Sequence, residues 1–172
     1  MTMIGMEQMF WGNSLKGYAV ALLILVAGAL FTKTVVTVVI RRLKKYADTT
    51  DTKIDDLFVT MLEKVALPAL YLSAVYVSAK TLALPPAVEA AANAAQMAVI
   101  VFFAARLATI AMGYGIQIYT EQRKGEEALV RSLEGMLKAA TFLVWALAAV
   151  ILLDNLGFKI SALLAGLGIG GV

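Results

Sequence analysis

Apolar residues dominate five segments of the chain, and short polar segments separate them. The five segments are residues 17–40, 65–79, 90–120, 139–153 and 160–172. Two charged residues interrupt them, Lys33 in the first and Arg106 in the third. A helix rises about 1.5 Å per residue, so about 20 residues cross a bilayer core of about 30 Å. The pattern therefore predicts four transmembrane helices and the start of a fifth. The second and fourth helices reach the required length only when the apolar residues next to their segments are included.

The composition agrees with an all-α membrane protein. Hydrophobic residues make up 61% of the chain and charged residues 16%, against about 25% in a typical soluble domain. The chain contains no cysteine and no histidine, which removes disulfides, thiolate metal sites and the commonest general base. No catalytic motif is present, and Asp55 and Asp56 suit a helix start better than a catalytic pair. We therefore expect no enzyme activity, no cofactor and no metal.

The basic residues indicate how the chain is oriented. Nine of them lie in the connections after the first and third spans, beginning with the basic loop 41–53, and three lie in the alternate connections. The positive-inside rule then places the N-terminus outside the cell and the fifth helix running inward. The net charge of +3 does not indicate nucleic-acid binding, because the basic residues cluster beside apolar segments.

Three charged residues near the spans have open interpretations. Lys33 either forms a buried ion site or lays its stem along the helix so that its ammonium group reaches the interface. Arg106 lies deeper, and an arginine within a membrane is a candidate for function. It either reaches toward the interface, binds a lipid phosphate, or pairs with Glu63 near the inner end of the second span. Pro68 is expected to kink that span, and Trp11 and Tyr18 suit aromatic anchors at the outer interface.

The last segment has small residues at regular helical spacing. Ala162, Gly166 and Gly170 recur every four residues and form a stripe, and Gly168 and Gly171 lie on a neighbouring face. Small residues let helix backbones approach closely in lipid. One interpretation is tight packing in a bundle or dimer. The other is a ring of identical helices around a pore, with these lining candidates: Leu163, Leu167 and Val172.

Two motifs resemble the small-conductance mechanosensitive channel (MscS-like) family. "LLDNLGFKISALLAGLGIGGV" at residues 152–172 is similar to the outer turn and the start of the family's pore helix, and "TKIDDL" at residues 52–57 is similar to its linker. The resemblance implies a homo-oligomeric, usually heptameric channel that membrane tension opens, with low ion selectivity and a large cytoplasmic domain. The pore helix stops where the family's upper constriction begins, so the chain is expected to be a fragment that lacks the cytoplasmic domain.

On this basis residues 1–122 are expected to form three outer helices that face lipid and sense tension. Residues 123–172 are expected to hold the inner fourth helix and the start of the pore helix. The expected partners are membrane lipids, ions and further copies of the chain, in a cell membrane, with the bacterial inner membrane favoured. A transporter subunit, in which Arg106 would face a cavity, and a non-conducting membrane scaffold are the alternatives.

Overall fold

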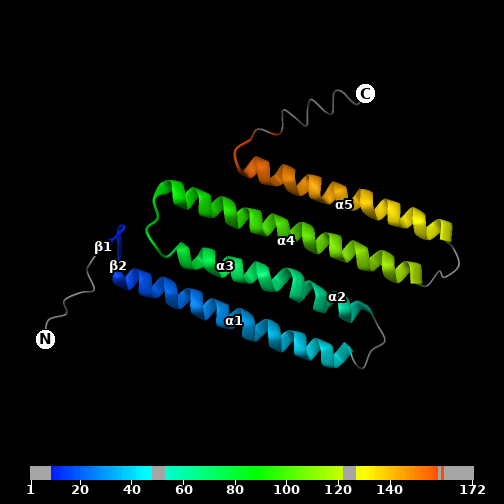
Figure 1. The fold of residues 1–172 in the computed structure, drawn as a ribbon, viewed down its shortest axis with the longest axis horizontal. Helices are drawn as coiled ribbons and strands as arrows, with labels where there is room; N and C mark the ends of the chain where they lie inside the picture. Colours follow the sequence, from blue (N-terminus) through cyan, green and yellow to red (C-terminus); the bar gives the residue numbers. More distant parts are fainter. Residues whose placement is uncertain (1–8, 48–52, 122–126, 159, 161–172) are drawn as a thin grey trace. The chain divides into compact units, whose positions relative to one another are not determined.

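The computed structural model describes residues 9–47, 53–121, 127–158 and 160, and within them the chain is almost entirely helical (Figure 1). The elements run in the order β1 (Met9–Phe10), β2 (Asn13–Ser14), α1 (Leu15–Ala47), α2 (Lys53–Met61), the π-helical turn η1 (Leu62–Ala66), α3 (Leu67–Ala79), α4 (Pro86–Glu121) and α5 (Glu127–Asn155).

Four helical segments of the described chain are long and apolar enough to cross a membrane. They are Leu15–Leu43, Asp56–Ala79, Pro86–Glu121 and Ala128–Asn155. The prediction of an all-α membrane protein with four full spans is thereby confirmed. The predicted fifth helix lies outside the described residues except for Ile160. The proposed division at residue 122 stays a prediction.

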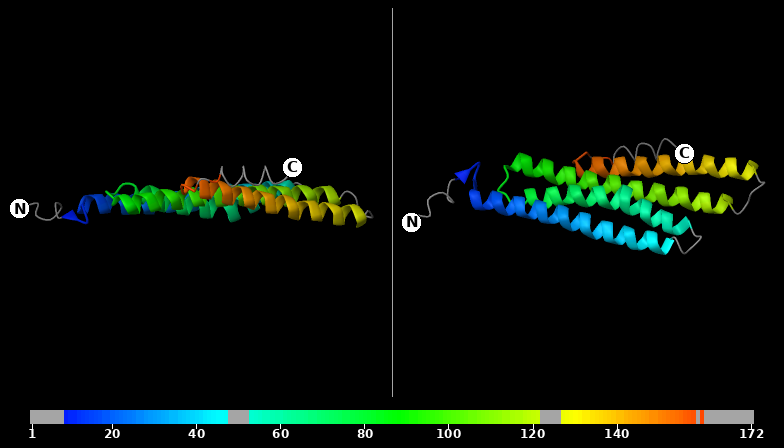
Figure 2. Two further views of the ribbon diagram at one scale, coloured as in Figure 1. Left: turned by 90° about the horizontal axis from the view of Figure 1, so that it is seen from above. Right: turned by 60° about the horizontal axis from the view of Figure 1, so that its bottom comes forward.

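Two compact units make up the chain, Met1–Val99 and Ile100–Val172. In the first unit α1 packs along α2, η1 and α3 to form a helical hairpin, and the right-hand view of Figure 2 shows α1 beside α3. In the second unit the later part of α4 meets α5, where the rings of Phe102 and Trp145 lie 5.3 Å apart between centroids.

Large apolar side chains cover much of the surface of α1. Leu23 is 68% exposed and Phe31 is 70% exposed, whereas small or β-branched residues are buried, among them Ala21 and Val36. A soluble protein of this size would hide such side chains. A bilayer solvates them, so the exposed surface agrees with a membrane location.

The second span changes its helical geometry just before its proline. The backbone N–H of Leu67 donates to the carbonyl of Leu62, five residues earlier, which closes the π-helical turn η1. Pro68 follows directly at the start of α3, within the same continuous helical segment, and has no N–H to donate to the preceding turn. The sequence predicts a kink at Pro68; the structure has a π-helical turn just before this residue, and the kink itself stays a prediction.

A short antiparallel hairpin precedes α1 and adds the one pair of strands in the described residues to the predicted all-α fold. Met9 pairs with Ser14 and Phe10 with Asn13, which leaves Trp11 and Gly12 as the turn. Both turn residues have positive φ, +50° for Trp11 and +79° for Gly12, as a type I′ turn requires. Glycine adopts this conformation freely, whereas Trp11 pays a strain of about 1–3 kcal/mol.

The turn after α5 is a Schellman motif. The N–H of Phe158 donates to the carbonyl of Leu153, and the N–H of Gly157 donates to the carbonyl of Asp154. Gly157 has φ +88°, the left-handed conformation that this helix end needs. The turn expected from the "LDNLG" motif is therefore present.

Candidate functional site

Helices α1 and α3 approach each other through small residues. A Cβ atom added to Gly28 would lie 3.1 Å from the Cβ of Ala74, closer than side chains normally pack. The absent side chain therefore lets the two backbones come together. Without a hydrophobic drive between helices in lipid, such close van der Waals packing is a main source of association. We call the Gly28–Ala74 pair the small-residue contact.

A buried hydrogen bond supports the small-residue contact one turn further along α3. The Ser78 hydroxyl donates to the backbone carbonyl of Ala21 over 2.6 Å, and the Ser78 residue is 8% exposed. Thr32 and Val36 continue the buried stripe on α1. Ala21, Gly28, Thr32 and Val36 follow at intervals of seven, four and four residues, so they share one helix face. Its first two residues, Ala21 and Gly28, contact α3 directly.

Polar side chains join α3 to the beginning of α4 within the first unit. The Tyr76 hydroxyl donates to Oδ1 of Asn93 over 2.9 Å, and Nε2 of Gln96 donates to the Ser73 hydroxyl over 3.1 Å. Ser73 and Tyr76 are three residues apart on α3, and Asn93 and Gln96 are three residues apart on α4. The two hydrogen bonds therefore lie about one helical turn apart along the same pair of helix faces. We call these four residues the polar clasp. Its bonds lie within candidate spans, where unpaired polar groups are costly.

Removing one bond of the polar clasp is expected to loosen α3 from α4 slightly. Tyr76→Phe deletes the hydroxyl and keeps the ring, so it should lower the free energy of unfolding by about 0.6 kcal/mol, the average for such bonds in membranes. Tyr71→Phe on the same helix is the control. Chemical unfolding in detergent micelles measures both, and an equal effect of the two variants would show that the Tyr76 bond does not stabilise the fold.

An ion pair ties the turn after α3 to the first turn of α4. Nζ of Lys80 lies 2.6 Å from Oε1 of Glu89, and both side chains are partly exposed. The hydrogen bond from the ammonium group to the Glu89 carboxylate, and the charge of that carboxylate, raise the pKa of Lys80 above its ordinary value. The pair connects the two ends of a short loop rather than distant parts of the fold.

The stabilisation from this ion pair is expected to depend on pH. The pKa of Lys80 is higher in the folded state than in the unfolded state. The stabilisation of the fold by the ion pair is therefore fully present below the unfolded-state pKa of Lys80. It is lost as the pH rises through the folded-state pKa. The melting temperatures of the wild type and Glu89→Gln should therefore differ slightly near neutral pH and converge in strong alkali. High salt should also reduce the difference. A difference that is constant across the whole range would contradict the pairing.

The charged residues singled out from the sequence are all exposed. Lys33 lies on α1, Glu63 in η1 and Arg106 on α4. Exposure of Lys33 agrees with the interpretation in which its ammonium group reaches the interface. Glu63 belongs to the first unit and Arg106 to the second, and the pairing between them stays a prediction.

The predicted pore-helix positions lie outside the described residues. They are Ala162, Leu163, Gly166, Leu167, Gly168, Gly170, Gly171 and Val172. Their roles in packing and in lining a pore therefore stay predictions. The described part of the chain leads up to them through α5 and the Gly157 turn.

The spans, their lipid-exposed surfaces and their small-residue and polar contacts define a multi-span α-helical membrane protein. Residues 138–172 match the family model for transmembrane helices 2/3 of mechanosensitive ion channels. The chain belongs to the MscS-like family of mechanosensitive channels, as its last 21 residues indicated. The match covers the second half of α5, the turn at Gly157 and the glycine-rich residues 160–172.

Two curated relatives carry channel names. The chain is 30% identical over 176 residues to the small-conductance mechanosensitive channel MscMJ of Methanocaldococcus jannaschii, which covers 97% of this chain and 49% of the relative. It is 27% identical over 166 residues to the large-conductance mechanosensitive channel MscMJLR of the same organism, with coverage of 93% and 45%. The chain thus spans about half the length of the curated relatives that it matches. No solved structure matches it.

Proposed function

We propose that this chain forms transmembrane helices of an ion channel that membrane tension opens, with low ion selectivity and no enzyme activity. The observation that carries the proposal is the match of residues 138–172 to helices 2/3 of mechanosensitive channels. That segment contains the Gly157 turn and the glycine-rich sequence that would follow it as a pore helix. Low selectivity follows from an apolar pore lining, which offers ions no charged or carbonyl ligands.

The proposed mechanism is mechanical. Tension favours the state with the larger area in the membrane plane, so helices that face lipid carry the force. Helix α4 has 36 residues and a length of about 54 Å at 1.5 Å per residue, which exceeds a bilayer core of about 30 Å. Tilt of a helix that is longer than the bilayer changes as the bilayer thins, and this change would be transmitted to the following helices.

The small-residue contact and the polar clasp make this transmission possible. They join α1, α3 and the beginning of α4 at several points, so the helices of the first unit would move together. Lipids between the outer helices would then bias the closed state, and the pore helices would slide on Gly168 and Gly171. Assembly as a homo-oligomer, with seven subunits as the expected number, supplies the ring. The N-terminus lies outside the cell membrane in this arrangement.

Flux from liposomes after osmotic downshock tests the proposal and separates it from its alternatives. The complete gene product is reconstituted with a trapped fluorescent ion indicator. A channel releases ions rapidly after the downshock, and its flux rises without saturation as the ion concentration rises. A transporter, in which Arg106 would face the substrate cavity, gives a flux that saturates and does not need the shock. A scaffold gives no release above that of empty liposomes. Either of the last two results would overturn the proposal.

A further inference from the structure

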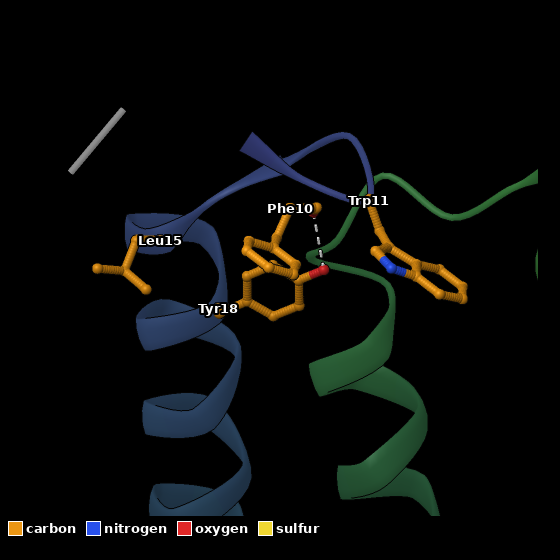
Figure 3. Close-up of a pocket in the computed structure, with 4 residues that line it drawn as sticks. All are labelled: Phe10, Trp11, Leu15 and Tyr18. Carbon is orange, nitrogen blue, oxygen red and sulfur yellow. Dashed lines mark hydrogen bonds between the residues drawn. The ribbon is translucent and has the colours of Figure 1, made fainter. Parts of the chain in front are cut away.

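The hairpin before α1 presents an aromatic surface at one end of the first unit. Four described residues line an open hollow of ≈ 500 Å³: Phe10, Trp11, Leu15 and Tyr18. Figure 3 shows the rings of Phe10 and Tyr18 together on one side of the hairpin and the indole of Trp11 projecting from its turn. Trp11 is 85% exposed and Phe10 is 68% exposed, so the described part of the chain leaves these rings uncovered.

The hairpin is held in place despite the strain at Trp11. The Tyr18 hydroxyl donates to the carbonyl of Phe10 over 3.0 Å, which fastens the first strand to α1. The side chain of Asn13 accepts a bond from the backbone N–H of Ala83 over 2.6 Å and donates one to the carbonyl of Ala83 over 3.0 Å. A strained residue persists only where its surroundings hold it, and such positions concentrate at sites of binding or function.

The position of the hollow indicates what would occupy it. Leu15 is both a wall of the hollow and the first residue of the candidate span Leu15–Leu43, so the aromatic surface continues directly into the lipid-exposed face of α1. Tryptophan and tyrosine favour the boundary between hydrocarbon and headgroups, because their rings are apolar and their N–H or O–H groups are polar. Lys16 follows Leu15 in the sequence and is exposed, and its positive charge could attract a lipid phosphate.

We propose that this hollow binds an acyl chain of a phospholipid from the leaflet at the hairpin end. The part of the acyl chain that is closest to the headgroup packs against Phe10, Trp11 and Tyr18. Leu15 lines the hollow on the side of α1. The two bonds between Asn13 and Ala83 connect the occupied hairpin to the turn between α3 and α4. A pull on the bound lipid would therefore reach both helical connections at this end of the unit. The site depends on the membrane location and not on channel activity.

Quenching of Trp11 fluorescence by brominated lipids tests the site. The chain has two tryptophans, so Trp145→Phe leaves Trp11 as the reporter. The protein is reconstituted in phosphatidylcholine vesicles brominated near the carbonyl end or near the methyl end of the acyl chain. Bromine near the carbonyl end is expected to quench Trp11 about twofold more strongly than bromine near the methyl end, because an interfacial indole lies at that depth. Iodide in the water should quench weakly.

A double variant and a control variant distinguish a site that holds a bound lipid from a hairpin that only touches the membrane interface. Phe10→Ser combined with Leu15→Ser removes two of the four side chains that line the hollow. This double variant is expected to reduce the quenching of Trp11 by brominated lipid by about half, because the acyl chain is no longer held against the indole. Phe158→Ser, which changes an exposed aromatic residue elsewhere, should leave the quenching unchanged. Circular dichroism confirms that the helices persist.

Three results would overturn the site. Strong quenching by iodide without quenching by lipid would place Trp11 in water. The absence of quenching by either agent would show that protein, such as a second copy of the chain, covers the hairpin. Full lipid quenching in the double variant would show that Trp11 lies at the interface without a bound chain. None of these results bears on downshock flux, so the site and the proposed channel function can fail separately.

Discussion

Replacing Gly28 by leucine is expected to separate α1 from α3 and to cause a large loss of stability in the first unit. Even the first added carbon would lie 3.1 Å from the Cβ of Ala74, and this neighbour cannot rotate away because its Cβ is fixed to the backbone. Overpacking of this kind costs about 1–3 kcal/mol. The buried bond from Ser78 to Ala21 depends on the same close approach and should weaken with it.

Gly113→Leu is the matched control for this substitution. Gly113 lies in α4, and an added Cβ there meets nothing within 4 Å in the described structure. Leucine is the better helix former, so this variant should be as stable as the wild type or slightly more stable. The measurement is unfolding by a denaturing detergent, followed by circular dichroism. Equal loss in both variants would show that α1 and α3 are not held by the small-residue contact.

Replacing Gly168 or Gly171 by leucine is expected to raise the tension that opens the complete channel. If pore helices slide past each other on these glycines, a bulky side chain must be forced across the neighbouring backbone during opening. The added barrier and the lost backbone contact would both act on the pore itself, so a large effect on gating is expected. Pressure-clamp recording gives the opening threshold of each variant relative to the wild type.

Gly135→Leu serves as the control in the same recordings. Gly135 lies in α5, and an added Cβ there has open space within 4 Å in the described structure. Its threshold should equal that of the wild type. Unchanged thresholds for both pore-helix variants would count against sliding on Gly168 and Gly171, while leaving tension gating itself intact.

Local patterns were sufficient to predict the spans and two of the interruptions. Hydropathy depends only on neighbouring residues, and it located the four crossings. Pro68 and Gly157 impose backbone geometry by themselves, so the disturbance in the second span and the turn after α5 followed from residue type. The resemblance to mechanosensitive channels likewise depended on a continuous motif, residues 152–172.

The contacts between helices could not be predicted in the same way. Gly28 has its role because Ala74 lies opposite, and Asn13 has its role because Ala83 lies within hydrogen-bond reach, 70 residues later. A signal for the polar clasp was present, since Asn93 and Gln96 stand three residues apart in an otherwise apolar segment. Their partners on α3 become evident only when the helices are placed side by side. The sequence did not predict the turn at Trp11, because tryptophan rarely adopts positive φ.

Single-channel recording under controlled membrane tension tests the central claim most directly. The complete gene product is reconstituted in giant liposomes, and suction is applied to excised patches while the current is recorded. The account predicts discrete currents that are absent at rest, appear above a threshold tension, rise steeply in open probability with further suction, and differ little between cations and anions. Patches that contain the protein and carry no current up to the tension at which the membrane ruptures, or currents that ignore tension, would contradict the account.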